Sequence, residues 1–214
     1  CLVLLSMYRQ KLEKDGELDE ILLIKKYLYN ESTLANSKKP LLWLHINFDV
    51  NARWWSSFNS RNSTCLNQPY LYLTIKSIID KCANDFQIVI INDETFEKIL
   101  PTWNIKLNNL PDPLRSHLRE LAYMKVLHRY GGLCIPPSFI CFQSFDSIFK
   151  TSLQICDVFI GELVCKSVLN EDVSFFPSNQ IIGCKKESAV MENYIKYLEK
   201  QVSDDYTNEM EFNK

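Results

Sequence analysis

The chain lacks several patterns by which common functions are recognised. Its 24 lysines and arginines are balanced by 26 acidic residues, for a net charge of −2, and no basic run occurs. A surface that follows nucleic-acid phosphates needs clustered positive charge, so we expect no nucleic-acid partner. The sequence also has no GxGxxG turn, no Walker loop and no nucleophile elbow. The signatures of dinucleotide binding, P-loop hydrolysis and α/β-hydrolase chemistry are therefore missing.

Metal-binding spacings are also missing. The eight cysteines contain no C-x-x-C pair, and the chain has only three histidines, which gives a zinc site little support. Several cysteines lie in apolar runs, where a free thiol behaves as a small buried hydrophobe. We therefore expect mostly reduced thiols and a cytosolic type of folding compartment. Two glycosylation triplets, at 30–32 and 62–64, would fit secretion, but such triplets are common by chance.

The beginning of the chain has a short apolar run. Residues 1–5 are apolar, whereas a membrane-spanning helix needs roughly 20 residues. We interpret this run as the first turn of an amphipathic helix, and the alternative is the end of an upstream membrane anchor. Helical spacing continues from Leu18 to Leu28, and a polar run ends at Pro40. The predicted organisation is an N-terminal helical extension at 1–39 and one domain at 40–214.

The rest of the chain alternates apolar strands with amphipathic helices. Residues 86–91 (FQIVII) are almost continuously apolar, as in a parallel strand covered on both faces. Such alternation predicts an α/β fold with a doubly wound, mostly parallel sheet flanked by helices. Further strands are expected at 41–48, 158–164 and 178–183, further helices at 69–81, 114–130 and 187–200, and a short helical turn at 145–149.

The central segment, 114–142, predicts a helix, a Gly-Gly turn and a buried strand. Gly131 is placed to end the helix, and Pro136 and Pro137 to end the strand. In this order the segment resembles the DxD-type sugar transferases, which are GT-A-fold glycosyltransferases of the capsular-polysaccharide and initiating-mannosyltransferase kind. Other landmarks in family order are Asn92-Asp93-Glu94 and Asn179 with Gly183. The resemblance covers about residues 40–200 and implies a GT-A-like fold.

The sequence departs from that family at its metal motif. The family binds Mn²⁺ or Mg²⁺ through an Asp-x-Asp that neutralises the diphosphate leaving group, but here the matching residues are Pro136, Pro137 and Ser138. Within the preceding helix, the family's Asp and Arg correspond to Glu120, which keeps a carboxylate, and to Tyr123, which does not keep the arginine. We therefore expect no metal site and no cofactor. Asp146 remains a weak alternative ligand.

Other candidate residues have two interpretations each. Trp54 and Trp55 would stack on a base or a sugar, or else fill the underside of the domain. His117 and His128 lie about 16 Å apart on one helix, too far for a joint metal site. Glu162 would be a general base or, as we prefer, an edge-strand carboxylate.

A second resemblance concerns the run RWWSSFNSRNSTCLNQPYLYLTIKSIIDKC together with Pro-Pro-Ser-Phe. Both are similar to glycosyltransferase-like proteins of large double-stranded DNA viruses. The resemblance implies a non-catalytic structural component of a virion or membrane-associated assembly, with protein partners. One alternative is an active transferase that uses a nucleotide-sugar with Mn or Mg. Another is a nucleotide- or glycan-binding module. Its candidate contacts are Asp93, Glu120, Tyr123, Trp54, Trp55 and Asn179.

Overall fold

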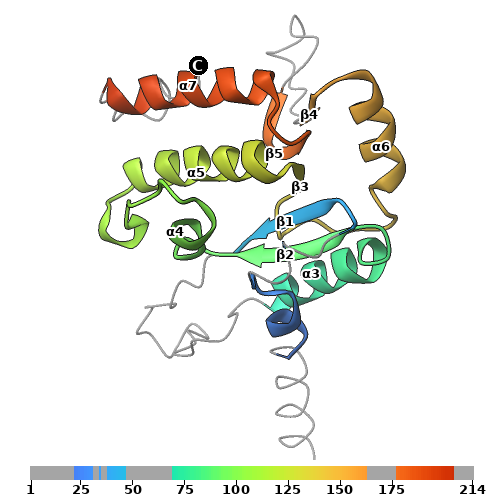
Figure 1. Ribbon diagram of the computed structural model, residues 1–214. Coiled ribbons are helices and arrows are strands. Elements are labelled where there is room, and N and C mark those ends of the chain that lie inside the picture. Colours follow the sequence, from blue (N-terminus) through green and yellow to red (C-terminus); the bar gives the residue numbers. More distant parts are fainter. Residues whose placement is uncertain (1–21, 31–33, 35–37, 47–68, 163–176, 205–214) are drawn as a thin grey trace, which may run out of the picture.

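Five strands form one open, mixed sheet with helices on both faces (Figure 1). The computed structural model describes residues 22–30, 34, 38–46, 69–162 and 177–204. Its strands are β1 (Leu41–His45), β2 (Gln87–Ile91), β3 (Gly132–Cys134), β4 (Val158–Glu162) and β5 (Pro177–Cys184). Its helices are α3 (Pro69–Cys82), α4 (Thr95–Ile99), the 3₁₀ turn η2 (Leu107–Asn109), α5 (Leu114–Tyr130), α6 (Asp146–Ile155) and α7 (Ala189–Ser203).

The strand order is β2-β1-β3-β5-β4. β1 runs parallel to both β2 and β3, whereas β5 runs antiparallel to both β3 and β4. Four strands therefore share one direction and β5 alone opposes them. The predicted α/β class with flanking helices is confirmed. The chain adds β2 on one side of β1 and later returns to add β3 on the other, so the order reverses between β1 and β3.

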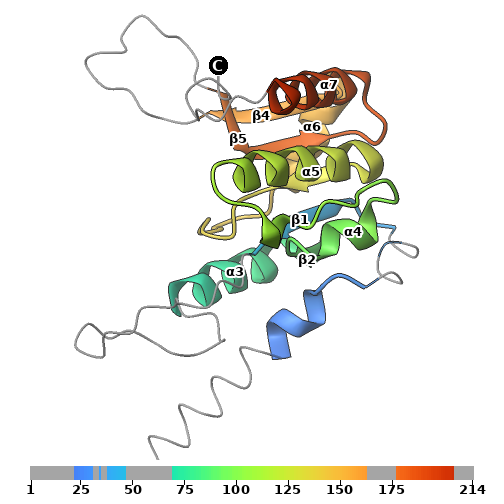
Figure 2. The same ribbon diagram turned by 90° about the vertical axis from the view of Figure 1, so that its left-hand side faces the viewer.

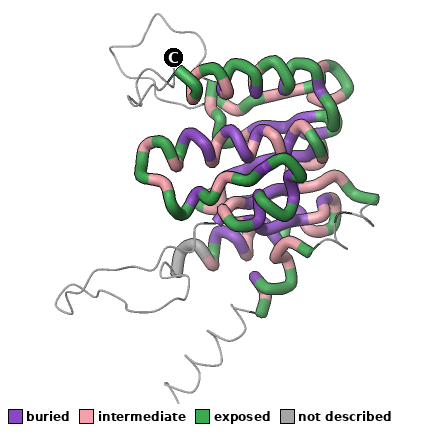
Figure 3. Tube along the Cα trace, turned by 60° about the vertical axis from the view of Figure 1, so that its left-hand side comes forward, coloured by how far each residue is buried: buried purple, intermediate pink, exposed green. Residues whose placement is uncertain are grey.

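Alternation along the strands divides the apolar side chains between two cores. On β1, Trp43 packs with residues of α4, α5 and α7, while Leu42 and Leu44 pack with residues of α3 and α6. Figure 2 shows α7 lying alongside α5, on the same side of the sheet. Buried segments accordingly run through the strands and along the facing sides of the helices (Figure 3).

The turn between α5 and β3 requires glycine twice. Gly131 has φ 70° and ψ −172°, a backbone region open essentially to glycine alone, and its N–H still bonds the carbonyl of Leu127 at 2.8 Å. Gly132 has φ 112°, and a Cβ there would lie 2.4 Å from the carbonyl oxygen of Leu41. The prediction that Gly131 ends the helix is confirmed, and Gly132 lets β3 approach β1 closely.

The described part of the N-terminal segment packs on the outer edge of the sheet. Residues 22–27 are helical, and Ile24 is buried in the core beneath α3. The N–H of Tyr29 then bonds the carbonyl of Ile90 on β2 at 2.9 Å. The remainder of the predicted extension lies outside the described residues. Within the described ranges, no helix combines the length and the apolar character needed to cross a membrane.

Candidate functional site

A cavity of about 380 Å³ opens at the carboxyl ends of β1 and β3. The strand order reverses between these two strands, and ligands of open α/β sheets bind at such switch points. Its lining comes from β1, α5, the end of β3 and β5, namely His45, Ser116, Arg119, Glu120, Tyr123, Met124, Cys134, Ile135, Pro136, Pro137, Asn179 and Gln180.

An ion pair between Asp93 and Arg119 borders this cavity. Arg119 Nε and one terminal nitrogen reach the two oxygens of Asp93 at 2.8 and 2.7 Å, and His45 Nε2 lies 2.8 Å from Oδ1. The His45 ring is stacked on Phe96, with centroids 5.6 Å apart. Burial would raise the pKa of Asp93, but the hydrogen bonds from Arg119 and His45 outweigh it and hold the pKa far below its usual range. Both oxygens of Asp93 are therefore occupied by protein groups.

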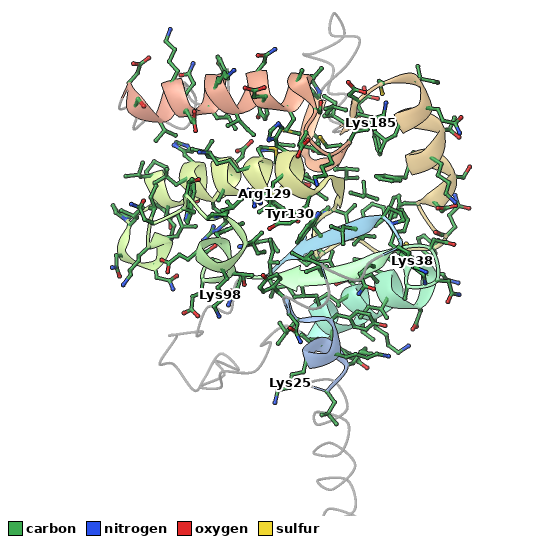
Figure 4. All side chains as sticks on the ribbon, viewed as in Figure 1. Lys25, Lys38, Lys98, Arg129, Tyr130 and Lys185 are labelled. Carbon is green, nitrogen blue, oxygen red and sulfur yellow. The ribbon has the colours of Figure 1, made fainter. Side chains whose placement is uncertain are left out.

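A second cavity, of about 360 Å³, lies on the Asp93 side of this pair. Its lining mixes acidic groups with Lys98 and Lys106, and Lys98 points outward from α4 in Figure 4. Asp93 lines this second cavity, whereas Arg119 and His45 line the first. The ion pair therefore forms a wall between the two spaces.

Glu120 binds neutral partners. Its Oε1 accepts a hydrogen bond from Asn179 Nδ2 at 2.9 Å and another from the Tyr194 hydroxyl at 3.2 Å. Burial and the neighbouring Glu120 charge both raise the pKa of Tyr194. These contacts join α5, β5 and α7 at one margin of the cavity.

A break in the β4–β5 register brings β5 residues to the cavity. Ile160 pairs with Ile182, but the next residue, Gly161, pairs with Ser178. The three residues between, 179–181, therefore have no partner on β4. Irregularities of this kind redirect side chains beside binding sites. Two of the three, Asn179 and Gln180, line the cavity.

Of the three residues that stand in place of the family's metal motif, two line the cavity and one does not. Pro136 and Pro137 line the cavity, whereas Ser138 is exposed in the turn that follows. The carbonyl of Pro137 accepts a hydrogen bond from Thr74 Oγ1 at 2.7 Å, which ties this turn to α3. Tyr123 also lines the cavity, and its hydroxyl donates to the carbonyl of Trp43 at 2.9 Å. Burial raises the pKa of Tyr123 well above its usual value.

The structure thus collects most of the predicted site residues and adds others. The first cavity is lined by Glu120, Tyr123 and Asn179, and Asp93 lines the second cavity. Trp54 and Trp55 lie outside the described residues. Sequence reasoning missed several lining residues, among them the polar side chains of His45, Arg119 and Gln180. Arg119 lies four residues before Tyr123 and so on the same helical face, a spacing that would have pointed to it.

Metal ligands do not converge in the part of the chain that the structure describes. No group of three or more His, Cys, Asp or Glu side chains there is placed to hold a metal ion. Asp146 lies on α6, where Oδ2 pairs with Lys150 at 2.8 Å, and it does not line the cavity. Glu162 is exposed at the end of the edge strand β4.

Comparison with known proteins finds no match to a family model, to a curated protein or to a solved structure.

Proposed function

We propose that this chain is a GT-A-like, glycosyltransferase-like domain that no longer carries out metal-dependent sugar transfer. It serves instead as a structural component of a virion or a membrane-associated assembly, with other proteins as partners. The family resemblance supports the first statement, and the similarity to proteins of large DNA viruses supports the second. The cavity lies where a nucleotide-sugar would be expected in such a fold.

The pairing of Asp93 with Arg119 is the observation that carries this proposal. A divalent cation needs carboxylate oxygens, and both oxygens of Asp93 already accept hydrogen bonds from Arg119 and His45. Metal binding there would have to displace a guanidinium from a largely buried, bidentate pair, which is among the stronger polar contacts in proteins. Proline at 136 and 137 offers no replacement ligand at the end of β3.

A second function, metal-independent binding of a nucleotide or glycan, is favoured by the cavity itself. Its volume lies within the range of small-molecule sites, and Glu120, Asn179 and Gln180 place polar groups at its margin. Such a module would keep the pocket without the chemistry.

Titration calorimetry with UDP- and GDP-sugars, with and without Mn²⁺, separates these functions. The structural proposal predicts no binding heat in either condition. Binding without metal would support the module, and binding that requires Mn²⁺ would contradict both and restore the transferase alternative.

A matched pair of variants assigns any binding to the cavity. Gln180→Trp places a bulky ring at the cavity lining and should abolish binding of the sugar nucleotide. Gln154→Trp, at an exposed position on α6, should leave it unchanged.

A further inference from the structure

Two buried thiols on different elements are in contact. Cys82 is the last residue of α3, and Cys141 lies in the segment after β3. Their sulfur atoms are 3.7 Å apart, and the two residues are 0% and 3% exposed. Cys141 Sγ also lies 3.0 Å from the carbonyl oxygen of Gln143. The Cys141 thiol therefore donates to that carbonyl, and the Cys82 thiol donates to the Cys141 sulfur.

Two hydrogen bonds hold the backbone near Cys141 against α3. The N–H of Cys141 donates to Ser77 Oγ at 2.9 Å, and the carbonyl of Pro137 accepts from Thr74 Oγ1 at 2.7 Å. Residues 137–141 are therefore fastened along α3 at two points, on the same side as the two thiols. Movement of the segment away from α3 would break both contacts.

The other described cysteines have different surroundings. The sulfurs of Cys134, Cys156 and Cys184 lie 3.9, 3.1 and 3.0 Å from main-chain carbonyl oxygens. Within the described ranges, Cys82 and Cys141 form the one recorded thiol–thiol contact, and all five described cysteines are free.

We propose that Cys82 and Cys141 form a disulfide that fastens the segment after β3 to α3. The cross-link goes beyond the proposed function and does not depend on it. A disulfide requires the two sulfurs, now 3.7 Å apart, to approach to about 2.05 Å. Because Pro136 and Pro137 line the cavity at the carboxyl ends of β1 and β3, the cross-link would also fix part of its lining.

A small-molecule disulfide such as oxidised glutathione supplies the oxidising power. One protein thiolate attacks a sulfur of that disulfide, its S–S bond breaks, and one glutathione thiol leaves with a proton. The second protein thiolate then attacks the mixed disulfide and releases the other glutathione thiol. The two cysteines lose two electrons and two protons, and oxidised glutathione gains both.

Burial determines when this exchange takes place. Burial raises the pKa of Cys82 to about 12, so its thiolate is scarce once the chain has folded. The exchange therefore belongs to the folding chain, while both thiols are accessible. A disulfide formed then becomes enclosed in the core beneath the sheet.

The test is to refold the full chain in a buffer of reduced and oxidised glutathione and to map its disulfides by mass spectrometry. We expect a cross-linked peptide pair containing Cys82 and Cys141 that separates on reduction. The cross-linked chain should melt about 5–15 °C above the reduced chain. Alkylation of both cysteines after refolding, or pairing of either with a different cysteine, would overturn the proposal.

Matched variants assign the stabilisation to this pair. Cys82→Ala and Cys141→Ala should each abolish the difference in melting temperature between oxidising and reducing conditions. Cys156→Ala, which removes a half-buried thiol bonded to the Ser152 carbonyl, should retain it. If a core variant does not fold, the peptide map of the unaltered chain still decides, because it needs no substitution.

Discussion

The two halves of the sheet differ in burial and in strand pairing, which is parallel among β2, β1 and β3 and antiparallel between β5 and its neighbours β3 and β4. In the parallel half, the central residues of β1, four of the five residues of β2 and all of β3 are buried. In the other half, β4 has no buried residue, and β5 is buried only over Ile182–Cys184. Those three residues are the ones that pair with β3. Burial in β5 therefore follows contact with the parallel half.

The cavity at the carboxyl ends of β1 and β3 lies where the two halves of the sheet meet. β1 and β3 supply its inner lining, and the irregular stretch of β5 supplies Asn179 and Gln180. The lining thus combines two largely buried strands, the helix α5 and a less buried strand. We infer that the parallel half contributes most of the stability, whereas both halves contribute to the cavity, and the following substitutions test the first statement.

The largest effect is expected from truncating the centre of β1. Trp43 is fully buried, and its Nε1 donates to the carbonyl of Gly131 at 2.9 Å. Trp43→Ala should lower the free energy of unfolding by about 3–5 kcal/mol, since it creates a cavity and leaves that carbonyl unpaired. Urea denaturation followed by circular dichroism measures the change.

The matched substitution in the other half is Ile160→Ala, on β4, where Ile160 is 41% exposed. We expect a loss below about 1 kcal/mol, because little buried surface is removed. Similar losses for Trp43→Ala and Ile160→Ala would show that the two halves contribute equally to the free energy of unfolding, and would contradict the inference that the parallel half contributes more.

A smaller difference in stability loss is expected between alanine substitutions at two glycines, Gly132 and Gly161. At Gly132 an added Cβ would meet the Leu41 carbonyl at 2.4 Å, on a backbone with φ 112°. Gly132→Ala should therefore cost about 3 kcal/mol. At Gly161 on β4 the nearest atom to an added Cβ is a side-chain carbon of Ile181, at 3.0 Å.

Gly161→Ala should cost less, about 1 kcal/mol, since Ile181 has to give way by only a few tenths of an ångström and the Gly161 backbone does not have a positive φ. Thermal melting of both variants distinguishes the two sites. A Gly161 variant as unstable as the Gly132 variant would mean that β4 is packed as rigidly as β3.

The sequence predicted the parallel half more fully than the other half. Runs such as FQIVII at 86–91 are apolar on both faces, and this pattern depends on no distant contact. The reversal of β5 and its shifted register were not predicted, because strand direction and pairing depend on which residues meet across the sheet. The helix at 146–155 was expected only as a short turn at 145–149.

The site was predictable where position along the chain fixes position in space. Asp93 follows one predicted strand, and Pro136 and Pro137 end another, so the order of the chain is enough to place these residues at the carboxyl ends of two strands. The pairing of Asp93 with Arg119 was not predictable, because these residues are 26 positions apart and meet through the packing of α5. The sequence therefore identified the Asp93 carboxylate but not Arg119, whose guanidinium pairs with it.

The smallest effect is expected from the ion pairs of the two halves. Asp93, after β2, is 10% exposed and pairs with Arg119 at 2.7 Å. Asp157, before β4, is 49% exposed and pairs at 2.8 Å with Lys185, which is labelled in Figure 4. At pH 7, Asp93→Asn should cost about 2 kcal/mol, and Asp157→Asn should cost about 0–1 kcal/mol, as exposed pairs do.

The pH dependence sharpens this last prediction. The hydrogen bonds from Arg119 and His45 hold the pKa of folded Asp93 below the ordinary value of 3.8. The unfolded chain therefore takes up a proton at Asp93 before the folded chain does, and the stabilisation is complete above about pH 5 and is lost as the pH falls through 4 toward 2. Urea denaturation across this range should show the stability of the unaltered chain converging with that of Asp93→Asn at acid pH. A gap that stays constant down to pH 2 would mean that the Asp93 charge does not contribute, and that the wall between the two cavities is held by packing alone.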